Sequence, residues 1–168
     1  PLFPFIEKLA VGVGDFLPGS GFVPVPLAGG QAGVLICYEV IFPEIGRAYG
    51  RSGATLLVTI TNDAWFGTTS APFQHLSLTA FRAVENRLYL VRAANTGVSA
   101  IIDPTGRVTA RTGIFEKTFL TGPVKLHREG TFYTKYGDLF VFFCMIALLV
   151  IFYNPGGRRL WSRKSKKK

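Results

Sequence analysis

The stretch that decides the fold runs from Gly33 to Glu44 and reads GVLICYEVIFPE. It begins with a short apolar run, Val34 to Cys37, of the kind that forms a buried strand. The residues that follow, Pro43 to Ser52, leave room for one short helix. A side chain at the end of a strand, where the chain turns toward a helix, stands on a rigid support and can meet a substrate. This pattern makes Cys37 a candidate nucleophile.

Further along the chain, short apolar runs alternate with helical patterns. The segment 71–87 has no internal glycine, has no proline after Pro72, and carries apolar residues at roughly helical spacing. The sequence DPTG at 103–106 is a strong turn signal, so the runs on either side of it are expected to form a hairpin. This order predicts an α/β fold in which helices cover a mixed sheet. The expected strands are 34–37, 56–61, 88–93, 99–102 and 107–110, and the expected helices are 43–52 and 71–87.

The segment Leu139–Tyr153 reads LFVFFCMIALLVIFY and contains no charged residue. As a helix it would be roughly 22 Å long at ~1.5 Å per residue, against ~30 Å for the bilayer core. With flanking residues added, we expect a transmembrane helix over 138–154. A buried core helix is the alternative that a run of this length allows.

Basic residues outnumber acidic ones by 19 to 10, which gives a formal net charge of +9. Seven of the basic residues fall in the last eleven positions, so the body without this tail has 12 basic and 10 acidic residues. A nearly neutral body is not a basic nucleic-acid-binding domain. The positive-inside rule places a basic tail after an apolar span in the cytoplasm, and a nucleic-acid patch is the alternative for the tail itself.

Neither a cofactor nor a metal is expected from the sequence. It has no CxxC or HExxH motif and no cluster of His and Cys. Cys37 and Cys144 lie in such different surroundings that no disulfide is expected between them. Cys144 falls within the apolar segment and is interpreted as a side chain that faces lipid or another helix.

The residues at the end of the first predicted strand leave alternatives open. Cys37 is either a nucleophile or a small buried hydrophobic residue, which most free cysteines are. If Cys37 is a nucleophile, the backbone N–H of Tyr38 can help to hold an oxyanion. Glu39 is either a polar partner in that site or a carboxylate that pairs structurally with an arginine.

Other polar and aromatic residues are interpreted structurally. Trp65 follows a predicted strand, so from the residues alone it is expected to pack in the core. His75 is expected to cap or pack on its helix rather than to act with Cys37. Arg82 and Glu85, three residues apart on the same predicted helix, are expected to form an ion pair or to link the helix to the sheet.

Several motifs in this chain together resemble the nitrilase, or carbon–nitrogen hydrolase, superfamily. They occur in family order and cover roughly residues 1–155. They are GVLICYE at 33–39 with FPE at 42–44, RAVENR at 82–87, VRAANTG at 91–97 and IDPTG at 102–106. The segment TNDAWFG at 61–67, together with the apolar C-terminal segment, is similar to the bacterial apolipoprotein N-acyltransferase family.

The resemblance implies an αββα sandwich, of which residues 1–126 would be the C-terminal part. A linker at 127–137, a transmembrane helix at 138–154 and a basic cytoplasmic tail at 155–168 would follow. The catalytic domain would lie on the periplasmic face of the bacterial inner membrane, as a monomer that uses no cofactor and binds no nucleic acid.

The implied reaction is a two-step acyl transfer. A cysteine takes a fatty acyl chain from a phospholipid as a thioester, and the N-terminal amine of a diacylglyceryl-cysteine apolipoprotein then accepts it. In this resemblance Cys37 matches the nucleophile, Tyr38 supplies the oxyanion N–H, and Glu39 is the acid beside the cysteine. Trp65 and Phe66 match a mobile loop at the lipid entrance.

One departure from the family pattern concerns the rest of the catalytic apparatus. The family also needs a Glu general base and a Lys, and neither Glu7 nor Lys8 lies in the expected motif. These two groups are therefore expected upstream of this chain, which alone would be inactive. A nitrilase-type amidohydrolase that uses water, and a membrane-tethered binding domain without activity, are the alternatives.

Overall fold

Three parallel strands form the centre of the sheet in the computed structural model, which describes residues 19–153. Within this range the sheet has six strands in the order β1-β2-β3-β4-β5-β6, with antiparallel pairs at both edges. The predicted mixed sheet is therefore confirmed. Its strands are β1 (Val25–Leu27), β2 (Gly30–Ile36), β3 (Leu56–Asn62), β4 (Leu90–Asn95), β5 (Ala100–Ile102) and β6 (Val108–Arg111). The helices are η1 (Cys37–Ile41), α2 (Pro43–Arg51), η2 (Ala64–Phe66), α3 (Ala71–Asn86), α4 (Phe132–Tyr136) and α5 (Leu139–Tyr153), of which η1 and η2 are 3-10 helices.

The parallel strands bring their carboxyl ends to one edge of the sheet. Leu35 of β2 is level with Thr59 of β3, and Thr59 is level with Arg92 of β4. β2 begins at Gly30 because the hairpin with β1 extends it, and it ends one residue before Cys37. Cys37 therefore lies at the carboxyl edge of the sheet, which is where open α/β sheets bind their ligands.

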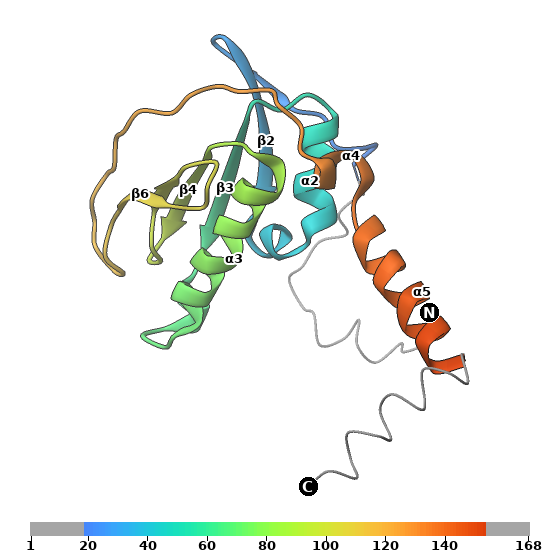
Figure 1. The fold of residues 1–168 in the computed structure, drawn as a ribbon. Helices are drawn as coiled ribbons and strands as arrows, with labels where there is room; N and C mark the ends of the chain where they lie inside the picture. Colours follow the sequence, from blue (N-terminus) through green and yellow to red (C-terminus); the bar gives the residue numbers. More distant parts are fainter. Residues whose placement is uncertain (1–18, 154–168) are drawn as a thin grey trace, which may run out of the picture.

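Helices α2 and α3 cover one face of the sheet (Figure 1). The predicted helices over 43–52 and 71–87 are confirmed in these two elements. Gly33 lets α2 come close to β2, because a Cβ at this position would lie 2.6 Å from the Cβ of Tyr49. The core between the helices and the sheet includes Leu35, Val40, Leu57, Leu76, Ala83, Leu88, Leu90 and Ile102.

The other face of the sheet is more open. Successive side chains of a strand point to opposite faces, so Ile36 and Ile60 lie on the face opposite to Leu35 and Thr59. Ile36 is 58% exposed and Ile60 is 45% exposed. Residues 19–153 thus contain one sheet with one helical layer, which is half of the αββα sandwich that the resemblance implies.

The hairpin between β5 and β6 forms where the turn signal predicts it. The Asp103 carboxylate accepts hydrogen bonds from the backbone N–H groups of Thr105 and Arg107, at 2.8 and 3.1 Å. The Thr105 hydroxyl also donates to this carboxylate, and that contact is the main cause of a lowered pKa at Asp103. Side-chain hydrogen bonds therefore fix the turn in addition to Pro104.

After β6 the chain runs through a connector, residues 112–131, into α4 and α5. The connector passes around the sheet, and α5 extends away from the sheet and its helices (Figure 1). Every side chain of α5 is exposed and none of them is charged, so α5 is not buried against the rest of residues 19–153. The predicted linker at 127–137 contains α4.

Helix α5 has 15 residues. No helix within residues 19–153 combines the length and the hydropathy that crossing a bilayer requires. The predicted transmembrane segment 138–154 runs past the described residues at its last position, and the predicted tail at 155–168 lies outside them.

Truncating a side chain on the covered face should destabilise the fold much more than truncating one on the open face. Leu57 is fully buried, so Leu57→Ala should lower the free energy of unfolding by about 2–5 kcal/mol through lost apolar burial and a cavity. Ile60→Ala on the same strand should cost less than about 1.5 kcal/mol, because nearly half of that residue is already in water. Denaturant unfolding followed by circular dichroism measures both values. Equal losses would contradict the assignment of the two faces.

Candidate active site

The chain turns sharply at Cys37, directly after β2. Cys37 has a φ of +52°, a left-handed conformation that non-glycine residues adopt at an energetic cost. It opens helix η1, and we call residues Cys37–Ile41 the nucleophile turn. The Cys37 side chain is half-buried, so it is not part of the packed core. This geometry suits a nucleophile, a role that stays a prediction for this residue.

Glu39 folds back onto the start of the nucleophile turn. Its Oε2 accepts a hydrogen bond from the backbone N–H of Ile36 at 2.7 Å. Within residues 19–153 the ion pairs do not include Glu39, so the arginine pairing left open by the sequence is not observed. Its charge still reaches Tyr49, whose pKa is raised first by burial and second by Glu39. Glu39 thus stabilises the start of the turn, and a part in catalysis stays a prediction.

Arg82 of α3 holds the other end of the nucleophile turn. Its Nη1 donates to the carbonyl oxygens of Val40 and Ile41, at 3.3 and 3.0 Å. Its Nη2 donates to Oε1 of Glu85 at 2.6 Å, which confirms the predicted ion pair. Burial raises the pKa of Glu85, although the hydrogen bond and the charge of Arg82 act in the opposite direction. The turn is therefore fixed at both of its ends.

A buried polar network lies behind the carboxyl edge, between β3, β4 and α3. One oxygen of the Asp63 carboxylate lies 2.6 Å from Nη2 of Arg92, and both side chains are fully buried. The other oxygen lies 3.1 Å from Nδ1 of His75, and Nη1 of Arg92 donates to Oγ1 of Thr79 at 3.2 Å. His75 is 4% exposed and therefore packs in the interior, as one of its expected roles requires, although the polar contacts of its ring are to Asp63 and Arg92 and not to its own helix.

Analysis of the sequence missed Asp63 and Arg92, although both carry a signal. Arg92 interrupts an apolar strand, and Asp63 directly follows another strand. A charged side chain inside a buried strand requires a partner of opposite charge. A residue at the carboxyl end of the neighbouring parallel strand lies close enough to supply one. That reasoning would have paired these two residues.

Burial and neighbouring charges act on the pKa of Arg92 in opposite directions. Burial lowers the pKa of Arg92, whereas Asp63 and, with a smaller effect, the charge of Cys37 raise it. The nucleophile turn places the Cys37 thiol next to the backbone N–H of Tyr38, an arrangement that suits attack on a carbonyl carbon.

Aromatic side chains surround this edge of the sheet. Trp65 is 88% exposed, so the expectation that it packs in the core is wrong. It lies in η2, the short 3-10 helix that follows the end of β3. The rings of Phe66 and Tyr38 lie 6.1 and 6.4 Å from the ring of His75. These side chains give the edge an apolar rim.

No group of His, Cys, Asp and Glu residues within 19–153 is arranged to hold a metal ion. Cys37 and Cys144 are both free thiols, and Cys144 is exposed on α5. The structure therefore brings Cys37, Tyr38 and Glu39 together with Phe66 at one edge, whereas Cys144 lies apart from them on the C-terminal helix.

Removing the carboxylate charge from the network should leave Arg92 buried without a counterion. Asp63→Asn should lower the free energy of unfolding by about 3–5 kcal/mol for this reason. Glu129→Gln is the matched control, because Glu129 is 75% exposed in its pair with His127 and should contribute less than about 1 kcal/mol. Urea denaturation at neutral pH measures both losses. A loss for Asp63→Asn as small as that of the control would show that the buried pair does not support the fold.

Comparisons with known proteins identify relatives of this chain. Residues 3–133 match the family model described as carbon–nitrogen hydrolase. An apolipoprotein N-acyltransferase of Geobacter metallireducens is 51% identical over 150 residues, which are 89% of this chain and 29% of that protein. An apolipoprotein N-acyltransferase of Thermotoga maritima is 35% identical over 161 residues, which are 89% of this chain and 32% of that protein. This chain therefore spans about three tenths of the length of these curated relatives.

A solved structure shows the same fold. Nit3 of Saccharomyces cerevisiae, a member of the nitrilase superfamily, superposes with a TM-score of 0.53 and 28% identity, over 60% of this chain and 40% of that chain. The predicted resemblance to the nitrilase superfamily and to apolipoprotein N-acyltransferases is confirmed. The family model covers most of the sequence, and the chain belongs to the carbon–nitrogen hydrolase family.

Proposed function

We propose that this chain is the part of an apolipoprotein N-acyltransferase that carries the nucleophile, Cys37. The observation that supports this most directly is a thiol at the end of a parallel strand, on a strained turn that Glu39 and Arg82 hold at its two ends. The 51% identity to a protein of that name favours this member of the family over others. The substrates follow from the reaction: a phospholipid as acyl donor and a diacylglyceryl apolipoprotein as acceptor.

In the first step, the Cys37 thiolate attacks the carbonyl carbon of an ester in the phospholipid. The backbone N–H of Tyr38 donates to the oxyanion that forms. The bond from the carbonyl carbon to the glycerol oxygen then breaks, and the general base returns to this oxygen the proton that it took from the thiol. A lysophospholipid leaves as the free alcohol, and the acyl chain remains on sulfur as a thioester.

In the second step, the N-terminal amine of the apolipoprotein attacks this thioester. An amide bond forms, the carbon–sulfur bond breaks, and the thiolate of Cys37 is restored, while the amine loses a proton to a general base. We place that base, a Glu, and the Lys of the family in a longer parent protein, because this chain spans about three tenths of its relatives. The chain alone is then inactive, and the parent acts as a monomer without cofactor.

The carboxylate of Glu39 is proposed as the acid beside the nucleophile. Its hydrogen bond to the N–H of Ile36 supports this role, because the bond holds the start of the turn on which the thiol is carried. Trp65 and Phe66 are proposed to border the lipid entrance. The 88% exposure of Trp65 supports this, since a large apolar ring in water can be covered by an acyl chain.

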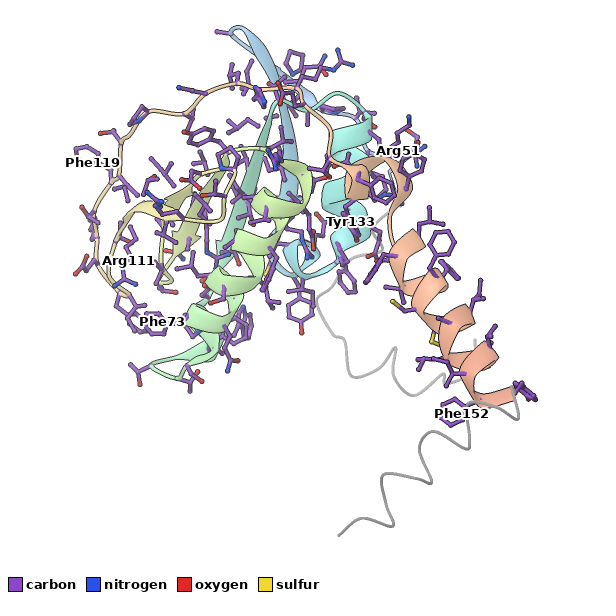
Figure 2. All side chains as sticks on the ribbon, in the orientation of Figure 1. Arg51, Phe73, Arg111, Phe119, Tyr133 and Phe152 are labelled. Carbon is purple, nitrogen blue, oxygen red and sulfur yellow. The ribbon has the colours of Figure 1, made fainter. Side chains whose placement is uncertain are left out.

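Helix α5 is proposed to lie in the bacterial inner membrane. Its side chains project on all sides and are apolar all round (Figure 2), which suits contact with lipid tails and does not suit contact with water. Tyr153 is its last residue and Tyr136 lies three residues before its first, as side chains of an aromatic belt would. With the basic tail in the cytoplasm, the domain that carries Cys37 lies on the periplasmic face.

Replacing the thiol should abolish the acyl-enzyme. When the full-length protein is incubated with phospholipid that carries a labelled acyl chain, Cys37→Ser should show no hydroxylamine-sensitive adduct, because the thioester cannot form. Cys144→Ser is the matched control and should keep the adduct. Mass spectrometry of the labelled peptide locates the acyl group. An adduct that survives Cys37→Ser would move the nucleophile elsewhere, and labelled free fatty acid without labelled apolipoprotein would favour an amidohydrolase.

Cysteine labelling in intact cells should report the proposed orientation. In the full-length protein with Cys37→Ser and Cys144→Ser, a maleimide that cannot cross the inner membrane should label Thr118→Cys from the periplasm. The same reagent should label Ser165→Cys, in the basic tail, only after the cells are lysed. Labelling of Ser165→Cys in intact cells with a permeable outer membrane would contradict a cytoplasmic tail.

A further inference from the structure

The contacts of Arg82 join the nucleophile turn to the segment that leads into α5. We infer that Arg82 is a positioning residue for Cys37, and that α4 sets the position of Arg82 through the carboxyl end of α3. This inference rests on the proposed function, because it assigns the means by which the proposed nucleophile is held.

The first link is the contact between Arg82 and the nucleophile turn. The Arg82 side chain is 6% exposed and donates from one nitrogen to the carbonyl oxygens of Val40 and Ile41. These carbonyls lie at the end of a short 3-10 helix, where oxygens without a partner inside the helix need another donor. Val40 is itself fully buried, so water does not replace the guanidinium there. Without Arg82 the turn must rearrange, and the strained backbone of Cys37 loses its support.

The second link is the carboxyl end of α3, which orients Arg82. Glu85 holds the second guanidinium nitrogen at 2.6 Å, and Nδ2 of Asn86 donates to the Arg82 carbonyl at 3.0 Å. Asn86 is 2% exposed, so its amide has a fixed set of partners. The position of the guanidinium therefore depends on where this last turn of α3 is held.

The third link is α4, which binds that last turn. The hydroxyl of Thr131 donates to the backbone carbonyl of Glu85, and it also accepts a hydrogen bond from the N–H of Thr134 at 2.9 Å, which caps α4. The hydroxyl of Thr134 lies 3.1 Å from Oδ1 of Asn86. Two threonines of the α4 region thus hold the two residues that orient Arg82.

The fourth link holds the other end of α4 against α2. Nε of Arg47 donates to the carbonyl oxygens of Tyr133 and Thr134, both at 3.1 Å, and Nη2 donates to that of Lys135 at 3.2 Å. Figure 2 shows Tyr133 beside α2. Only residues 137 and 138 separate α4 from α5, and a Cβ on Gly137 would lie 2.9 Å from Cζ of Arg47. A displacement of α5 is therefore passed through α4 to Arg82 and to the thiol.

Single-turnover acylation of the full-length enzyme separates positioning from folding. With labelled phospholipid in excess, the final amount of thioester is proportional to the amount of folded enzyme. The rate constant of acylation instead reports how well the thiol is positioned. Arg82→Lys keeps the charge but not the forked geometry, and should lower the rate constant about ten-fold or more with the amount of thioester nearly unchanged. Thr131→Val, at the far end of the contacts, should lower it about three-fold.

Two variants complete the test. Thr131→Ser keeps the hydroxyl and should show the original rate constant of acylation. Thr118→Val makes the same chemical change as Thr131→Val, but at an exposed position of the connector, and should leave the rate constant unaltered. Original rate constants in both Arg82→Lys and Thr131→Val, or losses only in the amount of thioester, would overturn this inference while leaving the proposed function intact. Absence of any thioester in the unmodified enzyme would overturn the proposed function, and this inference with it.

Discussion

The ion pair between Asp63 and Arg92 is the constraint on which the arrangement of the carboxyl edge depends. Both side chains are fully buried, and a buried charge without its partner is strongly destabilising. The pair therefore fixes the end of β3 against the middle of β4. Gly97 completes this enclosure, because a Cβ there would lie 2.3 Å from a carboxylate oxygen of Asp63. The loop after β4 can pass this close to the pair only because position 97 has no side chain.

Much of the fold follows from local sequence patterns. The apolar run at 56–61 and the helical spacing over 71–87 are local signals, and the structure reproduces both elements within one residue. The turn at Asp103 is equally local, because its side chain bonds to residues two and four positions ahead. These features need no knowledge of distant parts of the chain.

The features that the sequence did not reveal depend on contacts between distant residues. Asp63 and Arg92 lie 29 residues apart and meet only because β3 and β4 are parallel neighbours. Glu39 was considered as a partner for an arginine, but a backbone N–H three residues back satisfies it. Trp65 was expected in the core because an aromatic residue after a strand usually finds a covering layer. The described residues provide that layer on one face of the sheet only.

The absence of a polar stripe on α5 has a mechanical consequence. A helix that is apolar on every side has nearly the same free energy in hydrocarbon whichever side faces a given direction. It can therefore rotate about its own axis there at little cost. Contact with lipid alone would then not fix the rotational orientation of the domain that carries Cys37. The three carbonyl oxygens held by Arg47 at α4 supply the missing torsional restraint just before the helix begins. If α5 lies in the membrane as proposed, these hydrogen bonds, and not the lipid, fix how the domain that carries Cys37 is rotated relative to α5.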